Sequence, residues 1–313
     1  MDLVEKIKNL NNYLKTKNFN KVIEGGRSIL KKIPNNDYVL NLIGMAFQGK
    51  FQHKRAIKFF EESLTQNPGN VAAMNNYANS LKALGKFEQS KDLYEKILNI
   101  DPMYLRAYNN YANLKTSYND YDGAIDLFKK AISLIKKNKN IPISQHLEFM
   151  FSLAVAYQGY NKVKESNEVI EEMLQINPLH TGAHKLKSSI LKYSEENKDS
   201  LDHLKKMEDL NNTTNLNDDE KIDLFFSLGK AYEDIKDFDK AYNFLKEANE
   251  LRFKKFGSNL ENEKRLFHHI IKTFENINLD ENNKDFPSKK IIFICGMPRS
   301  GTTLVEQIIA SHG

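Results

Sequence analysis

A glycine-rich loop near the end of the sequence has residue types that could bind a phosphate group. Five apolar residues, Ile291–Cys295, precede it and are typical of a buried parallel strand. The loop Gly296–Thr303 follows, and residues 304–310 then have the pattern of a helix. Such a loop can direct backbone N–H groups and a helix N-terminus toward a phosphate. The sequence therefore predicts an anion-binding site here.

The loop departs from the Walker A motif, G-x-x-x-x-G-K-[ST]. Gly296 and Gly301 have the separation of its glycines, but Thr302 occupies the position of the lysine. A cation, Arg299, lies inside the loop instead. Since the lysine reaches the β- and γ-phosphates in ATPases and GTPases, the departure disfavours an ordinary enzyme of that kind. A nucleotide kinase or GTPase with a variant loop, and an accidental turn before a helix, stay open as alternatives.

The six residues P-R-S-G-T-T that end the loop resemble the 5′-phosphosulfate loop of sulfotransferases that use 3′-phosphoadenosine 5′-phosphosulfate (PAPS). The arginine and the helix after it are similar to the tyrosylprotein sulfotransferase branch. The resemblance implies that PAPS is the co-substrate, that no metal is needed, and that Arg299 stabilises the leaving oxygen as the catalytic group. The residues it assigns to PAPS binding are Pro298, Arg299, Ser300, Gly301, Thr302 and Thr303.

Asparagines form a second candidate site, for a peptide. Asn41, Asn75 and Asn109 are evenly spaced along the chain, and Asn79 and Asn113 each follow one helical turn later. Residues that share a phase in a repeated structure lie in a line, and each amide can both donate to and accept from a peptide backbone. The alternative is that an asparagine-rich composition scatters these residues without function.

The elements that carry these asparagines repeat with the same period. Pro34, Pro68 and Pro102 are separated by the same interval as the asparagines, and small residues such as Gly44 and Gly229 recur in phase with larger ones. This interval, about 34 residues, is the period of the tetratricopeptide repeat (TPR), with two antiparallel helices per repeat. The chain resembles this family over about residues 3–252, with a degenerate repeat around 181–212.

The predicted fold class is mainly α: a TPR superhelix, followed by the first strand, loop and helix of an α/β, P-loop-like sulfotransferase domain. We assign residues 1–256 to an array of about six hairpins, one of them degenerate. Residues 257–279 have helical spacing and are predicted to cap the array. A polar linker over 280–286 and the N-terminal fragment of the sulfotransferase domain over 287–313 complete the chain.

The asparagines also resemble a row in the TPR superhelix of O-linked N-acetylglucosamine transferase. In that protein, amides on the concave face of the array hold the backbone of an extended peptide. The resemblance implies that a protein or peptide binds on the concave face here. The residues it assigns to that contact are Asn41, Asn75, Asn79, Asn109 and Asn113.

Composition narrows the function further. The 46 Lys and Arg exceed the 41 Asp and Glu by a net charge of +5, which is spread along the chain. A nucleic-acid partner is therefore not expected, because proteins that bind nucleic acids usually gather basic residues on one face.

The single cysteine excludes a disulfide framework. No apolar run approaches the ~20 residues of a membrane span, so a soluble protein is expected, and the cytoplasm is its default compartment. His180 and His184 are four residues apart, as metal ligands on a helix can be, but no nearby cysteine or carboxylate completes a metal site.

Two functions from different classes follow. The first is a PAPS-dependent sulfotransferase whose TPR array collects a protein or carbohydrate acceptor. The second is a protein-interaction scaffold with a vestigial C-terminal loop. The family resemblance implies that the 3′-phosphate site and the catalytic base lie beyond Gly313. Residues 286–313 are also fewer than the ~40 usually needed to build a core, so we expect an incomplete fragment that is inactive by itself.

Overall fold

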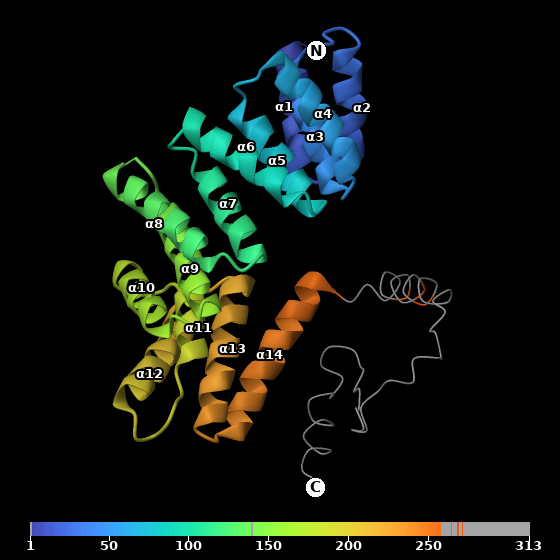
Figure 1. Cartoon of the computed structure of the whole chain (residues 1–313). Coiled ribbons are helices and arrows are strands. Elements are labelled where there is room, and N and C mark those ends of the chain that lie inside the picture. Colours follow the sequence, from blue (N-terminus) through green and yellow to red (C-terminus); the bar gives the residue numbers. More distant parts are fainter. Residues whose placement is uncertain (1, 139, 258–263, 265–267, 269–270, 272–313) are drawn as a thin grey trace, which may run out of the picture. The chain divides into compact units, whose positions relative to one another are not determined.

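The computed structural model describes residues 2–138 and 140–257, together with three single positions, 264, 268 and 271. All regular secondary structure in this described part is helical, and it contains no strand (Figure 1). Its fourteen helices pair in chain order as seven hairpins, where the sequence predicted about six. The helices are α1 (Leu3–Lys15), α2 (Phe19–Leu30), α3 (Asp37–Gly49), α4 (His53–Gln66), α5 (Val71–Ala83), α6 (Phe87–Ile100), α7 (Leu105–Ser117), α8 (Tyr121–Lys137), α9 (Ile143–Gly159), α10 (Val163–Ile176), α11 (Thr181–Ile190), α12 (Lys198–Thr213), α13 (Asp218–Asp234) and α14 (Phe238–Phe256).

The fourteen helices belong to one compact unit, Met1–Phe256, and Gly257–Gly313 are grouped as a second unit. The capping helix expected over 257–279, the linker over 280–286 and the sulfotransferase segment over 287–313 fall in the second unit. They lie outside the described residues, except for the three single positions, which are helical. None of the helices in the described part has the length and apolar character that a membrane crossing requires.

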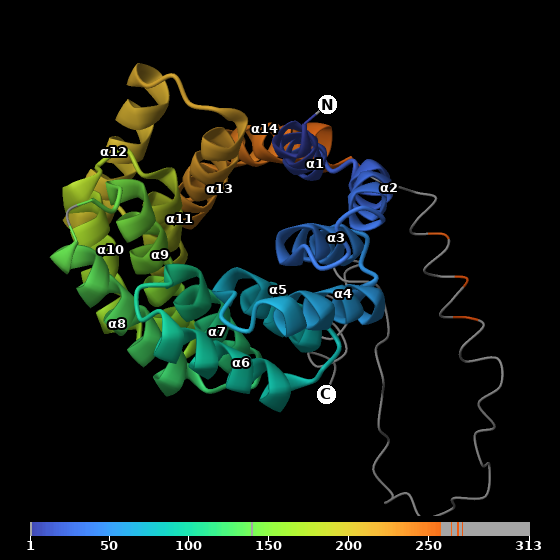
Figure 2. The same cartoon turned by 90° about the horizontal axis from the view of Figure 1, so that it is seen from above.

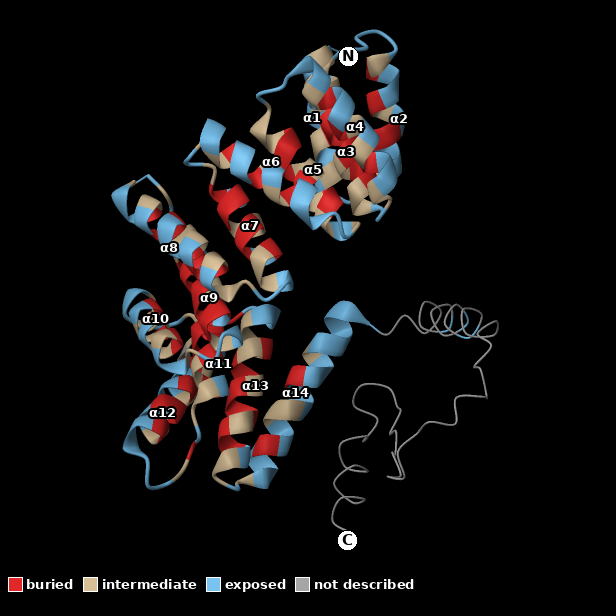
Figure 3. Ribbon diagram, viewed as in Figure 1, coloured by how far each residue is buried: buried red, intermediate tan, exposed pale blue. Residues whose placement is uncertain are grey.

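The hairpins follow one another as a TPR superhelix (Figure 2). Each second helix packs on the first helix of the next hairpin, as α2 does on α3 and α4 does on α5. The first helices, which carry odd numbers, also contact one another in succession. They lie on the inner side of the curve, and we call their surface the odd-helix face (Figure 2). Buried residues gather between the layers of first and second helices (Figure 3).

Within a hairpin, the two helices cross where the sequence has a small residue. A Cβ atom added at Gly44 of α3 would lie 2.4 Å from Cε1 of Phe60 on α4, whose ring is fully buried. Gly229 and Leu245 repeat this approach in the last hairpin, where the distance would be 2.6 Å. The absent side chain of one helix thus makes room for a large side chain of the other. The expected pairing of small and large positions is confirmed in the second and in the last hairpin.

In two other hairpins, a serine joins the two helices at the same crossing point. The Ser90 hydroxyl donates to the backbone carbonyl of Ala78 at 2.9 Å, and Ser166 donates to Ala154 at 3.0 Å. Both serines are fully buried. A buried hydroxyl costs free energy unless it is hydrogen-bonded, so these bonds allow a polar residue at a position that is alanine in other repeats.

Tyrosine–glutamate hydrogen bonds join neighbouring hairpins at the repeat period. The Tyr77 hydroxyl on α5 donates to Glu61 of α4 at 2.7 Å, and the Tyr111 hydroxyl on α7 donates to Glu95 of α6 at 2.6 Å. Burial, and after it the bond to Glu61, raises the pKa of Tyr77 to about 12. The phenol therefore stays protonated at neutral pH and remains a donor. These bonds hold successive hairpins in the same register.

The turns inside the hairpins repeat in their backbone as well. Lys17, Phe51, Gly85 and Asn119 have φ values of 57°, 59°, 73° and 65°, and they follow one another at the repeat period. Left-handed backbone costs a residue with a Cβ roughly 1–2 kcal/mol. The short turn imposes this conformation whatever the residue type, because it must reverse the chain between two packed helices.

Candidate functional site

Two of the predicted peptide-binding asparagines lie inside the array. Asn41 of α3 and Asn75 of α5 are each only 5% exposed. The Asn76 amide donates to Oδ1 of Asn41 at 3.0 Å, and the Asn110 amide donates to Oδ1 of Asn75 at 2.9 Å. These bonds join α3 to α5 and α5 to α7. The sequence signal for them is the doublet Asn75-Asn76, which recurs one repeat later as Asn109-Asn110.

The other three asparagines have different surroundings. Asn79 accepts a hydrogen bond from the Tyr94 hydroxyl at 2.7 Å. Asn109 is half-buried, whereas Asn113 is exposed and lines a hollow on the odd-helix face. The structure therefore does not bring the five residues together as one exposed row, and their role in peptide binding stays a prediction.

The hollow beside Asn113 is formed by α7, α8 and α9 and has a volume of about 370 Å³. Its base is apolar, because Phe128 and Ala156 are buried there. Val155 also lines the hollow and is 43% exposed. Hydroxyl groups and one amide supply hydrogen-bonding capacity around these apolar groups. We call this site the neutral hollow, and its residues are Asn113, Thr116, Ser117, Tyr121, Phe128, Phe151, Ser152, Val155, Ala156 and Gly159.

A second hollow of about 430 Å³ adjoins the first, and Phe151 and Ser152 line both. It is formed by α9, by the start of α11 and by the start of α13. Leu179 is 54% exposed at its edge. We call it the acidic hollow because four carboxylates line it, namely Glu148, Asp219, Glu220 and Asp223.

Local contacts hold the walls of the acidic hollow in place. The Phe151 ring stacks on His180, with ring centroids 6.4 Å apart. His180 Nδ1 accepts the backbone N–H of Ala183 at 3.0 Å and so caps α11. Burial lowers the pKa of His180, so the ring is neutral at pH 7 and can keep this role as acceptor. Lysines pair with two of the four carboxylates: Lys185 lies 2.7 Å from Asp223, and Lys255 pairs with Asp219.

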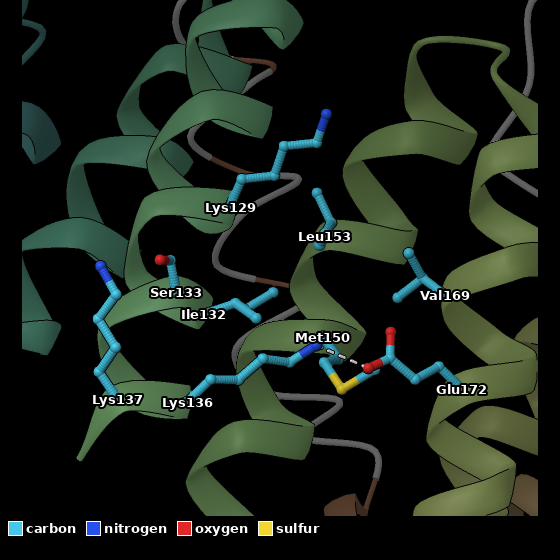
Figure 4. A pocket seen from close by; sticks show the side chains of 9 residues that line it. All are labelled: Lys129, Ile132, Ser133, Lys136, Lys137, Met150, Leu153, Val169 and Glu172. Carbon is cyan, nitrogen blue, oxygen red and sulfur yellow. Dashed lines mark hydrogen bonds and ion pairs between the residues drawn. The ribbon is translucent and has the colours of Figure 1, made fainter.

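A third pocket, of about 360 Å³, lies on another surface, between α8, α9 and α10 (Figure 4). Met150 and Leu153 form its buried base. Lysines of α8 stand around it, and Lys136 reaches across to Glu172 of α10 at 2.8 Å (Figure 4). About half of each partner in this pair is exposed, so the pair contributes little to stability. The pocket is separate from the two hollows of the odd-helix face.

The PAPS-binding residues expected from sequence, Pro298–Thr303 with Arg299, lie outside the described residues. Among the residues that are described, no group of three or more His, Cys, Asp or Glu could hold a metal ion. The site that the structure does position is the pair of adjoining hollows. Their apolar residues were not predicted from the sequence, although Phe151 and Val155 are four apart and hence share one face of a helix.

Comparisons with protein families support the assignment of the array to tetratricopeptide repeats. Family models of the tetratricopeptide repeat match residues 49–116, 105–138 and 222–255. A model of the sulfotransferase family matches residues 292–313. An uncharacterized protein of Aquifex aeolicus (strain VF5) is 29% identical over 170 residues, which are 53% of this chain and 21% of that protein. The chain thus spans about a fifth of the length of this curated relative.

Solved structures show the same fold. A tetratricopeptide repeat protein from Parabacteroides merdae superposes with a TM-score of 0.55 at 16% identity, over 84% of this chain and 96% of that one. The C-terminal part of a TPR repeat-containing protein from Cytophaga hutchinsonii gives a TM-score of 0.54 at 16% identity, over 78% and 95% of the two chains. At this identity the similarity concerns the fold alone.

Proposed function

We propose that the odd-helix face binds an extended segment of a partner protein. The described array consists of tetratricopeptide repeats and so forms a protein-interaction scaffold. The observation that carries this proposal is the pair of adjoining hollows that share Phe151 and Ser152. Two hollows side by side suit a continuous chain that places one side chain in each. An apolar anchor with hydrogen-bonding groups around it is the usual composition of such a binding site.

The chemistry of the hollows specifies the segment. Exposed Val155 and the aromatic ring of Phe151 favour an apolar side chain in the neutral hollow. Asn113 and Ser152 can hydrogen-bond to the peptide backbone beside it. The carboxylates of the acidic hollow favour a basic side chain at the next site, by charge complementarity.

Phe151→Ala is expected to weaken binding of such a segment at least tenfold, because the ring is the wall shared by both hollows. Aromatic side chains at the centre of an interface commonly contribute ~2 kcal/mol or more. Peptides would be selected against the array by display at pH 7.5, and their Kd measured by calorimetry. Tyr242→Ala on α14 is the matched control, since Tyr242 is 65% exposed and lines neither hollow. An equal effect of both substitutions would argue against the hollows as the binding site.

The C-terminal sequence favours a second function. We propose that residues 287–313 begin a PAPS-dependent sulfotransferase domain, and that the array presents a protein acceptor to it. The match of the sulfotransferase family model to residues 292–313 supports this, because it includes the loop Pro298–Thr303. In this proposal the loop N–H groups and the hydroxyls of Thr302 and Thr303 bind the 5′-phosphate. Arg299 stabilises the oxygen that leaves the sulfuryl group.

Nucleotide binding tests the second function. In a protein where residues 287–313 are continued by the rest of the domain, we expect 3′-phosphoadenosine 5′-phosphate to bind without added metal. The positive charge of the site would come from Arg299 and backbone amides, and not from a cation such as the Mg²⁺ of kinases. Isothermal titration with the bisphosphate, and separately with ATP and Mg²⁺, gives the answer. Tight binding of ATP–Mg²⁺ alone would indicate a kinase-type loop.

A further inference from the structure

Three buried side chains form a hydrogen-bonded network around the α11–α12 hairpin. His184 of α11, Tyr193 in the connecting segment and His203 of α12 are 3%, 0% and 1% exposed. His184 Nδ1 lies 3.0 Å from His203 Nε2. The other nitrogen of His184, Nε2, lies 2.8 Å from the carbonyl oxygen of Pro178. The other nitrogen of His203, Nδ1, lies 2.6 Å from the Tyr193 hydroxyl.

The network has one arrangement of protons when both rings are neutral. The Pro178 carbonyl can only accept, so His184 Nε2 carries a proton and His184 Nδ1 is an acceptor. His203 Nε2 must then donate to His184, which leaves His203 Nδ1 to accept from the Tyr193 hydroxyl. Every polar atom of the two rings therefore has a partner, and all of the bonds run in one direction from Tyr193 to Pro178.

The His184–His203 contact joins the two helices of this hairpin directly. In the described array, α11 and α12 lack the close backbone packing that joins the two helices of each other hairpin. Helix α11 has only 10 residues, and the chain leaves it in an extended conformation at Leu191. The segment is the one that sequence analysis identified as a degenerate repeat. Its histidines are 19 residues apart in sequence, so no local pattern could have revealed their contact.

A proton added to either ring would be poorly accommodated. Burial, and after it nearby positive charge, lowers the pKa of His203 to about 3, and burial also lowers the pKa of His184. A charged His203 would also force the Tyr193 hydroxyl to turn its proton away. The charged and titratable groups around the network come from four helices and one cap. They are His180, which caps α11, Lys187 of α11, Lys206 of α12, Glu171 of α10, and Lys230 and Asp234 of α13. Glu171 pairs with Lys187, and the two residues of α13 contact Tyr193.

We propose that His184, Tyr193 and His203 form an acid-operated lock, which opens the α11–α12 hairpin when a histidine takes up a proton. The hairpin would open as a local unit while the remaining hairpins stay folded. Opening would also remove a wall of the acidic hollow, because His180, Thr181 and Gly182 at the start of α11 line it. The consequence for a bound segment rests on the proposed function of the odd-helix face.

The direction of the pH effect follows from the pKa of His203. It is lowered in the closed hairpin, so the open state binds more protons between pH 6.5 and pH 3. The closed state is therefore fully favoured above pH 6.5 and loses stability as the pH falls toward 3. For one histidine with a pKa of about 6.5 when open and about 3 when closed, the opening equilibrium rises about 30-fold between pH 7.5 and pH 5.

Hydrogen exchange at pH 7.5 and pH 5, read by mass spectrometry and corrected for the intrinsic rate, tests the lock. We expect protection in α11 and α12 to fall about 30-fold or more, while α5 and α6 change little. Glutamine offers a donor and an acceptor in place of the ring nitrogens but does not titrate. H203Q should therefore remove about 30-fold of the effect, and H184Q/H203Q should abolish it. H268Q, at an exposed histidine, is the control.

A loss of protection that is the same in H184Q/H203Q as in the parent would overturn the proposal. If the double variant fails to fold, as judged by circular dichroism, the same criterion applies to H203Q and H184Q separately. Binding of a display-selected peptide at pH 7.5 and pH 5 is measured in parallel. Failure to select any peptide would count against the function proposed for the odd-helix face, whereas the exchange result would still decide for or against the lock.

Discussion

Phe60→Ala should lower the free energy of unfolding of the array by about 3–5 kcal/mol, the usual cost of removing a large aromatic side chain from a core. Phe60 is fully buried on α4, and its ring lies over Gly44 of α3. The two helices are held apart by the rest of their interface, so they cannot close the gap completely. Urea denaturation followed by circular dichroism measures the change.

Gly44, which lies under the Phe60 ring, provides a second variant and allows a double-mutant cycle. A Cβ at Gly44 would lie 2.4–2.9 Å from three atoms of the Phe60 ring, so Gly44→Ala is expected to destabilise by about 1–3 kcal/mol through overpacking. In the Phe60→Ala background the same methyl group would enter the cavity. The two substitutions together should therefore cost less than the sum of their separate effects.

Gly25→Ala is the matched control for this cycle. A Cβ at Gly25 would meet only the terminal Cδ2 of Leu10, at 2.7 Å. A terminal methyl group can move more easily than a packed ring, and alanine is the better helix former by roughly 0.5–1 kcal/mol. We expect a near-neutral effect. Strict additivity of Gly44→Ala and Phe60→Ala would show that the crossing point is not as tightly packed as the distances indicate.

The array could be predicted from sequence because its packing follows the period. Gly44 and Phe60 belong to positions that recur once in every repeat, and each meets its partner inside one repeat. Contacts between repeats are equally regular, as Tyr77–Glu61 and Tyr111–Glu95 illustrate. In such a solenoid each repeat contacts only its neighbours, so a local pattern determines the fold.

The hollows could not be predicted, because they arise where the period is broken. The insertion around residues 136–140 extends α8 to Lys137, and α9 then begins at Ile143. Both helices have 17 residues, whereas α5 and α7 have 13. Phe151 consequently lies 76 residues after Asn75, the interval that also separates Ser166 from Ser90, and a search at one fixed period does not find it. Asn41 and Asn75 do follow the repeat period, but the period did not reveal that their side chains are buried and hydrogen-bonded between helices.

Arg299→Ala is expected to reduce kcat for sulfuryl transfer by about 10²–10³-fold, in a protein where the domain that begins at residues 287–313 is complete. Groups that stabilise charge developing in a transition state usually contribute this much. The arginine would act on the bridging oxygen as it leaves, so its loss should affect kcat more than KM. Steady-state kinetics with PAPS and a protein acceptor measures both quantities.

Thr302→Ala and Thr303→Ala are the control variants for this prediction. In the proposed site their hydroxyls contact the 5′-phosphate, which carries its charge in the ground state and in the transition state alike. Removing a contact of that kind raises KM and leaves kcat nearly unchanged. The affinity for 3′-phosphoadenosine 5′-phosphate should fall with KM in these variants, and much less in Arg299→Ala. If Arg299→Ala instead raised KM and left kcat unchanged, the arginine would be a substrate-binding residue and the leaving oxygen would need another source of positive charge.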